Sequence, residues 1–226
     1  KYDIIVNEPS NPWIAGVAAL FTRDFFRVVN AHLADDGVFS QWVQTYRVPQ
    51  GVISVVVANL RAVFPHVEVW YSNPSDLVLL ASRRPIRWSE ARVAALMAPG
   101  TPLGRSFHDW LEIDRPSQLL GRFLLGERGT ALLAGAARFQ HSDNRPSLEC
   151  VAARGLLGTT SVGVTFDSLL GIRAAAGDSL PDLADWRLSP GEWQAAYGRA
   201  LPAENRFALS YAEEALRLAP ADAERR

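Results

Sequence analysis

Cysteine and histidine are scarce in this sequence of 226 residues, which contains one cysteine and four histidines. The single cysteine, Cys150, excludes a disulfide framework within the chain, and such usage is typical of a reducing compartment. Because Leu148 and Val151 lie near Cys150, we expect a small core residue rather than a nucleophile. The histidines are scattered without metal-ligand spacing, so the sequence predicts no metal site.

A large excess of one charge is also missing, and so are long apolar runs. The formal net charge is -1, which gives no overall field that favours nucleic acid or an anionic membrane. No run approaches the roughly 20 apolar residues that span a bilayer, and no signal peptide is visible. We therefore expect a cytoplasmic chain without direct membrane insertion, either free or as a soluble domain of a membrane protein.

Strands and helices alternate at the start of the chain. The apolar, β-branched run Tyr2–Val6 is typical of a strand that is buried on both faces. Apolar residues at every fourth position predict a helix from Val17 to Leu33, which Gly37 ends as a left-handed cap. The second strand is expected at Val38–Val43.

A second helix begins at Pro49 and stops at Phe64-Pro65. Two strands follow, His66–Tyr71 and Leu77–Ala81, and the turn signal Asn73-Pro74-Ser75 between them predicts an antiparallel pair. The order strand, helix, strand, helix, strand, strand indicates an α/β fold, the second half of a doubly wound sheet that ends in a hairpin. This first segment covers residues 1–84.

Two further segments are expected to be mostly helical. Residues 85–154 contain a helix at Arg87–Met97, helical stretches with Gly and Pro breaks over 99–140, and a turn leading into a short extended piece at Ser142–Val151. Residues 155–226 form a tail with helices at Glu192–Leu201 and Arg206–Leu218. The last of these resembles the second helix of a tetratricopeptide repeat, and an ordinary terminal amphipathic helix is the alternative.

The acid Glu8 lies just past the end of the first strand, and the rigid turn Pro9-Ser10-Asn11-Pro12 follows Glu8. In open α/β sheets, ligands bind outside the carboxyl ends of the strands. A carboxylate held there can meet a cationic substrate or accept a proton from an amine. The alternative is a surface glutamate near a turn.

Four stretches together resemble the second half of the polyamine aminopropyltransferase (spermidine synthase) family: YDIIVNEPSNPWIAGVAALFTRDFF, ADDGVFSQWVQ, LRAVFPHVEVW and SDLVLLAS. The variant Glu-Pro-Ser-Asn-Pro-Trp, joined to a later Ser-Asp-Asn-Arg-Pro-x-Leu-Glu segment, is similar to spermidine-synthase-like proteins often fused behind membrane-spanning segments. The resemblance implies a Rossmann-like sheet of the class I S-adenosylmethionine-dependent transferases. It also implies aminopropyl transfer from decarboxylated S-adenosylmethionine to a diamine such as putrescine.

Site residues follow from the matched positions. Glu8 matches the catalytic Asp of the family, which makes it the proton acceptor and amine anchor, and Asn11 matches a second Asp. Trp13 lies in the loop that covers the active site in relatives, where such loops exclude water. The polar residues Gln41, Gln44 and Tyr46 come at or after the second strand and are candidates to line the same crevice, or they are ordinary polar groups at a strand end.

Departures from the family pattern keep other functions open. Asn11 is neutral, Glu8 is one methylene longer than Asp, and the turn at Asn73 is too short to carry the family's diamine-binding aromatic residue. One alternative is a methyltransferase that uses S-adenosylmethionine itself. Another is a catalytically degenerate binding or regulatory domain of a membrane protein, with a tail that recruits partners.

The glycine-rich loop that grips the nucleoside is not identified in this sequence, since neither Gly100–Gly104 nor Gly126–Gly129 is expected to follow a strand and open a helix. We therefore expect the chain to be the C-terminal piece of a longer enzyme and to be inactive alone. Relatives are commonly dimers, which implies a homodimer as one assembly. In the later motif, Arg145 is expected to pair with Asp143 or Glu149 and to pin that segment to the sheet.

Overall fold

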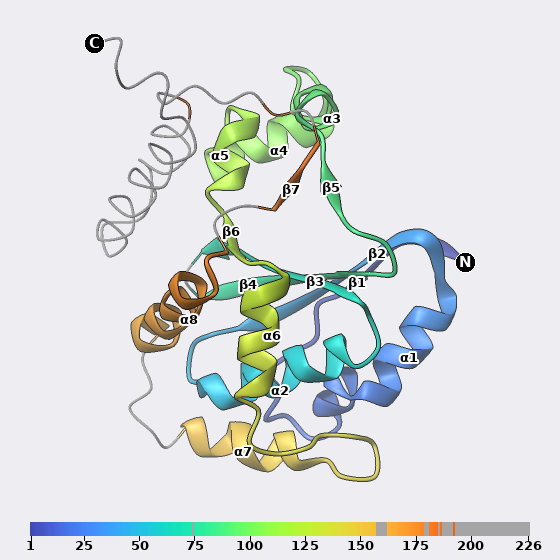
Figure 1. Cartoon of the computed structure of the whole chain (residues 1–226), viewed down its shortest axis with the longest axis vertical. Helices are drawn as coiled ribbons and strands as arrows, with labels where there is room; N and C mark the ends of the chain where they lie inside the picture. Colours follow the sequence, from blue (N-terminus) through green and yellow to red (C-terminus); the bar gives the residue numbers. More distant parts are fainter. Residues whose placement is uncertain (74, 157–161, 179–180, 185, 187–191, 193–226) are drawn as a thin grey trace. The chain divides into compact units, whose positions relative to one another are not determined.

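The computed structural model describes residues 1–73, 75–156, 162–178, 181–184, 186 and 192. The chain divides into two compact units (Figure 1): Lys1–Ile86 with Leu124–Asp178, and Arg87–Phe123 with Ser179–Arg226. Residues 124–154 and 155–178, which the sequence places in two separate helical segments, thus both belong to the unit of the main sheet. The expected helices at Glu192–Leu201 and Arg206–Leu218 lie, apart from Glu192, outside the described residues.

The helices and strands of the first unit are, in chain order, β1 (Tyr2–Asn7), the 3-10 helix η1 (Val17–Phe21), α1 (Arg23–His32), β2 (Leu33–Gln44), α2 (Gln50–Arg61), β3 (His66–Asn73), β4 (Asp76–Ser82), β6 (Phe123–Leu125, which begins at the unit boundary), α6 (Glu127–Gly135), α7 (Ser147–Leu156) and α8 (Val162–Ala176). The strands form one sheet in the order β1-β2-β4-β3-β6. β1 is parallel to β2, whereas β4 is antiparallel to both β2 and β3. The chain is therefore an α/β protein with a mixed five-stranded sheet, compatible with a Rossmann-like fold, and the predicted hairpin is confirmed.

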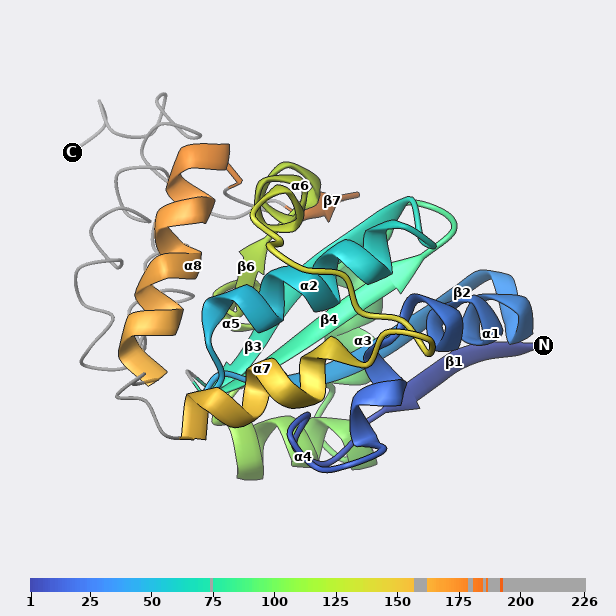
Figure 2. The same ribbon diagram turned by 90° about the horizontal axis from the view of Figure 1, so that it is seen from below.

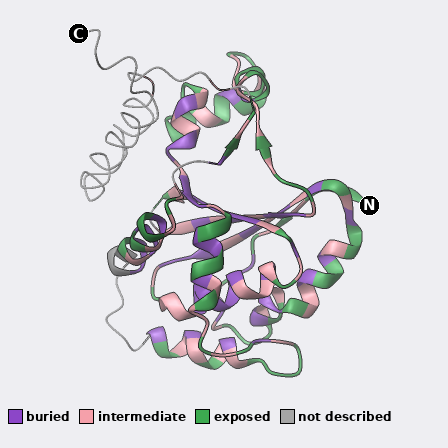
Figure 3. Ribbon diagram, in the orientation of Figure 1, coloured by how far each residue is buried: buried purple, intermediate pink, exposed green. Residues whose placement is uncertain are grey.

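Helices α1, α2 and α6 lie across one face of the sheet, and α7 packs against α2 (Figures 1 and 2). The strand residues that face these helices are buried (Figure 3), namely Phe39, Gln41, Val43, Val67, Val69, Leu77, Leu79 and Ala81. Four aromatic rings pack together where α1 meets the sheet, with neighbouring centroids 5.8 to 6.4 Å apart: Phe25, Phe26, Phe39 and Phe64. Because successive side chains of a strand point to opposite faces of the sheet, every second residue of these strands lies in this core.

The prediction that the first strand is buried on both faces is wrong. β1 is the end strand of the sheet. Its side chains Tyr2, Ile4 and Val6 are 61%, 69% and 68% exposed. They point away from the helices, because Ile5 and Asn7 pair with the core residues Phe39 and Gln41 of β2. An apolar run shows that a segment is suited to a sheet, but not how many neighbours cover it.

The single helix predicted from Val17 to Leu33 is divided in two, because Thr22 adopts an extended conformation and caps α1 by accepting a hydrogen bond from the Phe25 amide. Gly37 is not a left-handed cap, since β2 already begins at Leu33 and Gly37 lies within it. A Cβ atom on Gly37 would approach the Leu33 side chain and the Tyr2 carbonyl oxygen to 2.9 Å. The glycine is therefore used for close packing of β2 on β1.

Two segments are more helical than predicted. Residues 147–151, expected to be extended, open α7, and Leu148 and Ala152 are fully buried one turn apart. Helix α8 was not predicted, although its buried residues Phe166, Leu169 and Leu170 recur at helical spacing. Within the described ranges, no helix is long and apolar enough to cross a membrane.

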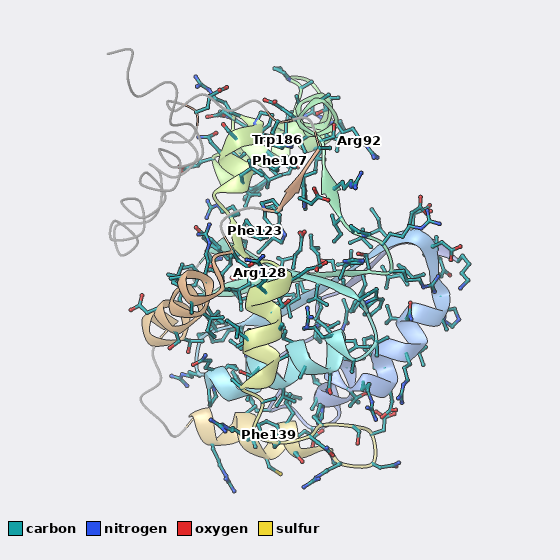
Figure 4. All side chains as sticks on the ribbon, in the orientation of Figure 1. Arg92, Phe107, Phe123, Arg128, Phe139 and Trp186 are labelled. Carbon is teal, nitrogen blue, oxygen red and sulfur yellow. The ribbon has the colours of Figure 1, made fainter. Side chains whose placement is uncertain are left out.

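In the second unit the short strands β5 (Arg87–Trp88) and β7 (Asp182–Leu183) pair in parallel. Its helices are α3 (Glu90–Leu96), α4 (Pro102–Leu111) and α5 (Pro116–Leu120). The predicted helix at Arg87–Met97 thus begins later, because the Ser89 side chain caps it by accepting a hydrogen bond from the Arg92 amide. Trp186, labelled in Figure 4, donates a 2.7 Å hydrogen bond from its indole to the Trp88 carbonyl oxygen.

Candidate functional site

The carboxyl ends of β1 and β2 lie side by side, because the two strands are parallel and Asn7 is in register with Gln41. The Asn7 amide donates a 2.8 Å hydrogen bond to Oε1 of Gln41 and a 3.4 Å bond to the Leu20 carbonyl oxygen. Gln41 donates in turn to the Trp42 carbonyl oxygen at 3.0 Å. Both ends of the buried Gln41 amide are therefore used inside the unit, which gives this candidate a structural role.

The turn after β1 is tied to the segment after β2. Pro9 and Pro12 are buried, and Asn11 and Trp13 are half-buried. The Tyr46 hydroxyl donates a 3.2 Å hydrogen bond to Oδ1 of Asn11. The structure thus brings two of the predicted site residues together at the carboxyl edge of the parallel strand pair.

Glu8 is the first residue after β1, at the position the sequence predicts, and its side chain is exposed. The strand that it follows is the end strand of the sheet and not an interior strand. An exposed carboxylate keeps full access to a cationic solute, but water screens its attraction for that solute. Any strong effect of Glu8 on an amine therefore requires further groups of the site around it.

Gln44 ends β2 and is 1% exposed. Within the part of the chain that the structure describes, neither its Oε1 nor its Nε2 has a hydrogen-bond partner. A buried amide left unpaired costs about 1–3 kcal/mol. Among the candidates, Gln44 is the one whose side-chain amide has no hydrogen-bond partner within the described residues.

Asp76, which sequence reasoning missed, faces Gln44 from β4. Its Oδ1 accepts a 3.2 Å hydrogen bond from the Trp42 indole, and its Oδ2 accepts a 2.7 Å bond from the Asn73 amide. Asn73 Oδ1 also accepts a bond from the Ser75 amide, so the hairpin turn and the end of β2 are held together. The sequence feature that could have indicated Asp76 is its position directly after the turn Asn73-Pro74-Ser75.

Residues 141–149 hold the loop and 3-10 helix that follow β1. Glu149 accepts a 2.8 Å hydrogen bond from the Gly16 amide, and Asp143 accepts a 2.7 Å bond from the Thr22 hydroxyl. His141 is buried between the Ala18 carbonyl oxygen, 2.7 Å from its Nε2, and the Leu148 amide, 3.4 Å from its Nδ1. This cluster fixes the loop that carries Asn11 and Trp13.

The expected pairing of Arg145 with Asp143 or Glu149 is wrong, because the two carboxylates bind Thr22 and Gly16 instead. Arg145 is exposed, and its backbone forms a bridge with Ser142. The prediction that Cys150 is a core residue is also wrong, since this cysteine is exposed on α7.

The stretch at Gly126 does follow a strand and open a helix, contrary to the sequence-based expectation. Gly126 lies between β6 and α6 and occupies the N-cap position of α6. The amides of Gly126 and Gly129 donate to the carboxylate of Asp178, which comes from the segment after α8. The anion-binding end of this helix is therefore already occupied by a side chain of the chain itself.

Comparison with known protein families, curated proteins and solved structures finds no match for this chain. Among the described residues, no group of three or more His, Cys, Asp or Glu side chains gathers where it could hold a metal ion. What the fold and site define is an α/β protein with polar groups at the carboxyl ends of two parallel strands.

Proposed function

We propose that this chain is part of a spermidine-synthase-like transferase that moves an aminopropyl group from decarboxylated S-adenosylmethionine to a diamine. In this proposal the mixed sheet is the C-terminal half of a class I S-adenosylmethionine-dependent transferase sheet. The observation that supports it most is the junction at the ends of β1 and β2, where Glu8 follows one strand and the turn behind it is bound through Asn11 to Tyr46.

Glu8 acts on the amine in this proposal. Its carboxylate attracts the cationic diamine and accepts a proton from the attacking nitrogen. The nitrogen lone pair then forms a bond to the carbon next to the sulfonium sulfur. The C–S bond breaks, and its electron pair stays on sulfur, so the donor leaves as a neutral thioether.

Binding of putrescine to the 226-residue chain, measured by calorimetry, tests the role of Glu8. We expect Glu8→Gln to weaken binding by about twofold to fivefold, as the loss of an exposed ion pair predicts. Asp3→Asn is the matched control, because Asp3 is an exposed acid of the same strand away from its carboxyl end. Equal putrescine affinity of the wild type and Glu8→Gln would contradict the assignment.

A binding or regulatory module is the second candidate, and the exposure of Glu8 on an end strand favours it. Calorimetry with S-adenosylmethionine and with its decarboxylated form separates the candidates. Preference for the decarboxylated donor supports aminopropyl transfer, and preference for S-adenosylmethionine supports methyl transfer. Binding of neither donor, together with putrescine binding that does not depend on Glu8, supports the module.

A further inference from the structure

The two edges of the five-stranded sheet are protected to different degrees. β6 forms one edge, has three residues and is buried throughout. β1 forms the other edge and has six residues, of which Tyr2, Ile4 and Val6 are each at least 61% exposed. Edge strands of native proteins are usually short or interrupted by proline or lysine, because their free N–H and C=O groups pair readily with other strands. Tyr2–Asn7 contains neither residue, so β1 is suited to accept a further strand.

Other exposed apolar side chains of the first unit lie near β1. Ile14 is in the loop that follows β1, and Val28 is on α1. Helix α1 lies along the same edge of the sheet (Figures 1 and 2), and the Lys1 ammonium donates a 2.6 Å hydrogen bond to the Ala31 carbonyl oxygen at its end. Among the described large apolar residues of this unit, Leu132 on α6 is the one exposed elsewhere. An apolar surface gathered at one edge in this way marks an interaction site.

The sequence of β1 is complementary to a second copy of itself in antiparallel orientation. When Ile4 lies opposite Ile4 of the copy, Tyr2 lies opposite Val6 on the same face, and the reverse pair forms across the axis. Pairs of an aromatic and a β-branched residue stabilise neighbouring strands. On the other face Asp3 lies opposite Ile5, so no two like charges are directly opposed. This register keeps the exposed faces of both copies on one side, as a two-fold axis through the sheet requires.

The charges at the two ends of β1 select the antiparallel orientation. Lys1 precedes the strand, and Glu8 follows it. In the antiparallel pair, Lys1 of each copy lies beside the Asn7–Glu8 end of the other copy. A parallel pair would instead bring the two Lys1 side chains together and the two Glu8 side chains together, which is unfavourable.

We propose that the 226-residue chain forms a two-fold symmetric dimer in which β1 pairs with β1 of a second copy. Each copy uses its free edge once, so the assembly closes at two copies and does not grow further. The interface is small, because it covers one strand and its immediate surroundings, and we expect a dissociation constant on the order of 10–100 μM. The inference goes beyond the proposed function and does not rest on it, since a strand from a longer parent protein would take this edge in place of the second copy.

Sedimentation equilibrium of the 226-residue chain tests the inference, because position 4 faces itself across the axis. Ile4→Lys and Ile4→Asp each place like charges opposite one another, and each should raise the dissociation constant of the dimer at least about tenfold. An equal mixture of the two variants should dimerise again, because a lysine then lies opposite an aspartate. Leu132→Lys is the matched control, since it adds the same charge at an exposed position of α6, and it should sediment like the wild type.

Thermal melts of dilute protein separate assembly from folding. Ile4 is exposed in the single chain, so Ile4→Lys and Ile4→Asp should melt close to the wild type under conditions in which all three are monomers. A wild-type chain that stays monomeric up to about 1 mM overturns the inference. So does a dimer that survives both substitutions, or a mixture of the two variants that stays monomeric. These measurements contain no amine and no transfer donor, so their failure and the failure of putrescine binding are distinguished.

Discussion

The hydroxyl group of Tyr46 donates a 3.2 Å hydrogen bond to the side-chain oxygen of Asn11, which lies 35 residues earlier in the chain. This bond joins the turn after β1 to the segment after β2. It is the direct link in the structure between two residues that the sequence proposes for one site. Together with the Asn7–Gln41 pairing, this link holds the turn that follows Glu8 against the end of β2.

Removal of the Tyr46 hydroxyl should loosen the turn after β1. We expect Tyr46→Phe to lower the free energy of unfolding by about 0.5–1.5 kcal/mol, the usual net contribution of one hydrogen bond. Urea unfolding measures the change, and a double-mutant cycle with Asn11→Ala isolates the pair. Tyr2→Phe is the control, because Tyr2 is 61% exposed. A coupling energy of zero between positions 11 and 46 would contradict the prediction.

Strands β1 to β4 were predictable from the sequence because their signals are local, whereas β6 lies in a stretch that was expected to be helical. β-branched runs, helix stops at Phe64-Pro65 and the turn at Asn73 each follow from neighbouring residues. The exposure of β1 was not predictable, since burial depends on which strand lies beside it. The hydrogen bond that Glu149 accepts from Gly16 was also not predictable from the sequence, because Gly16 lies 133 residues away.

For the candidate site, the sequence placed Glu8 just past a strand and grouped Tyr46 with Asn11 as candidates for one crevice, and a hydrogen bond joins Tyr46 to Asn11 in the structure. It could not separate Gln41 from Gln44, although both are buried amides on β2. Within the described residues Gln41 has partners and Gln44 has none. The difference depends on β1, because Asn7 of that strand donates to Gln41.

The Glu149 carboxylate should control local opening of the loop after β1. Gly16 has a positive φ of 83°, and its amide donates to Glu149. We expect Glu149→Ala to speed hydrogen exchange of the Gly16 amide several-fold with little effect on global stability, because the contact is exposed and local. Glu149→Gln keeps an acceptor oxygen and should exchange at a rate close to the wild type. The prediction fails if Glu149→Ala leaves exchange at Gly16 unchanged.

Asp178 should stabilise the first turn of α6 as a capping carboxylate. Its loss in Asp178→Ala leaves the amides of Gly126 and Gly129 without an acceptor, and we expect a loss of about 0.5–2 kcal/mol. Asp167→Ala, at an exposed position of α8, is the control.

Added anion provides a second readout for Asp178. Because helix N-termini bind phosphate and sulfate, we expect sulfate to raise the melting temperature of Asp178→Ala more than that of the wild type or Asp167→Ala. Sodium chloride at equal ionic strength controls for general salt effects. An identical sulfate response in all three proteins would show that Asp178 does not occupy an anion site.

His108 and Asp114 form a pH-dependent pair in the second unit, with 2.5 Å between Nδ1 and Oδ1. The hydrogen bond that His108 donates to the Asp114 carboxylate, together with the charge of that carboxylate, raises the pKa of His108 above the ordinary value of 6.5, and Asp109 adds a smaller effect in the same direction. Since the pKa is raised in the folded state, the pair stabilises the fold fully below the unfolded pKa, and this contribution is lost as the pH rises through the folded pKa. Titration of the His108 ring protons by NMR should show a clear fall in this pKa in Asp114→Asn and a smaller fall in Asp109→Asn. Equal titration of His108 in the wild type and Asp114→Asn would contradict the assignment.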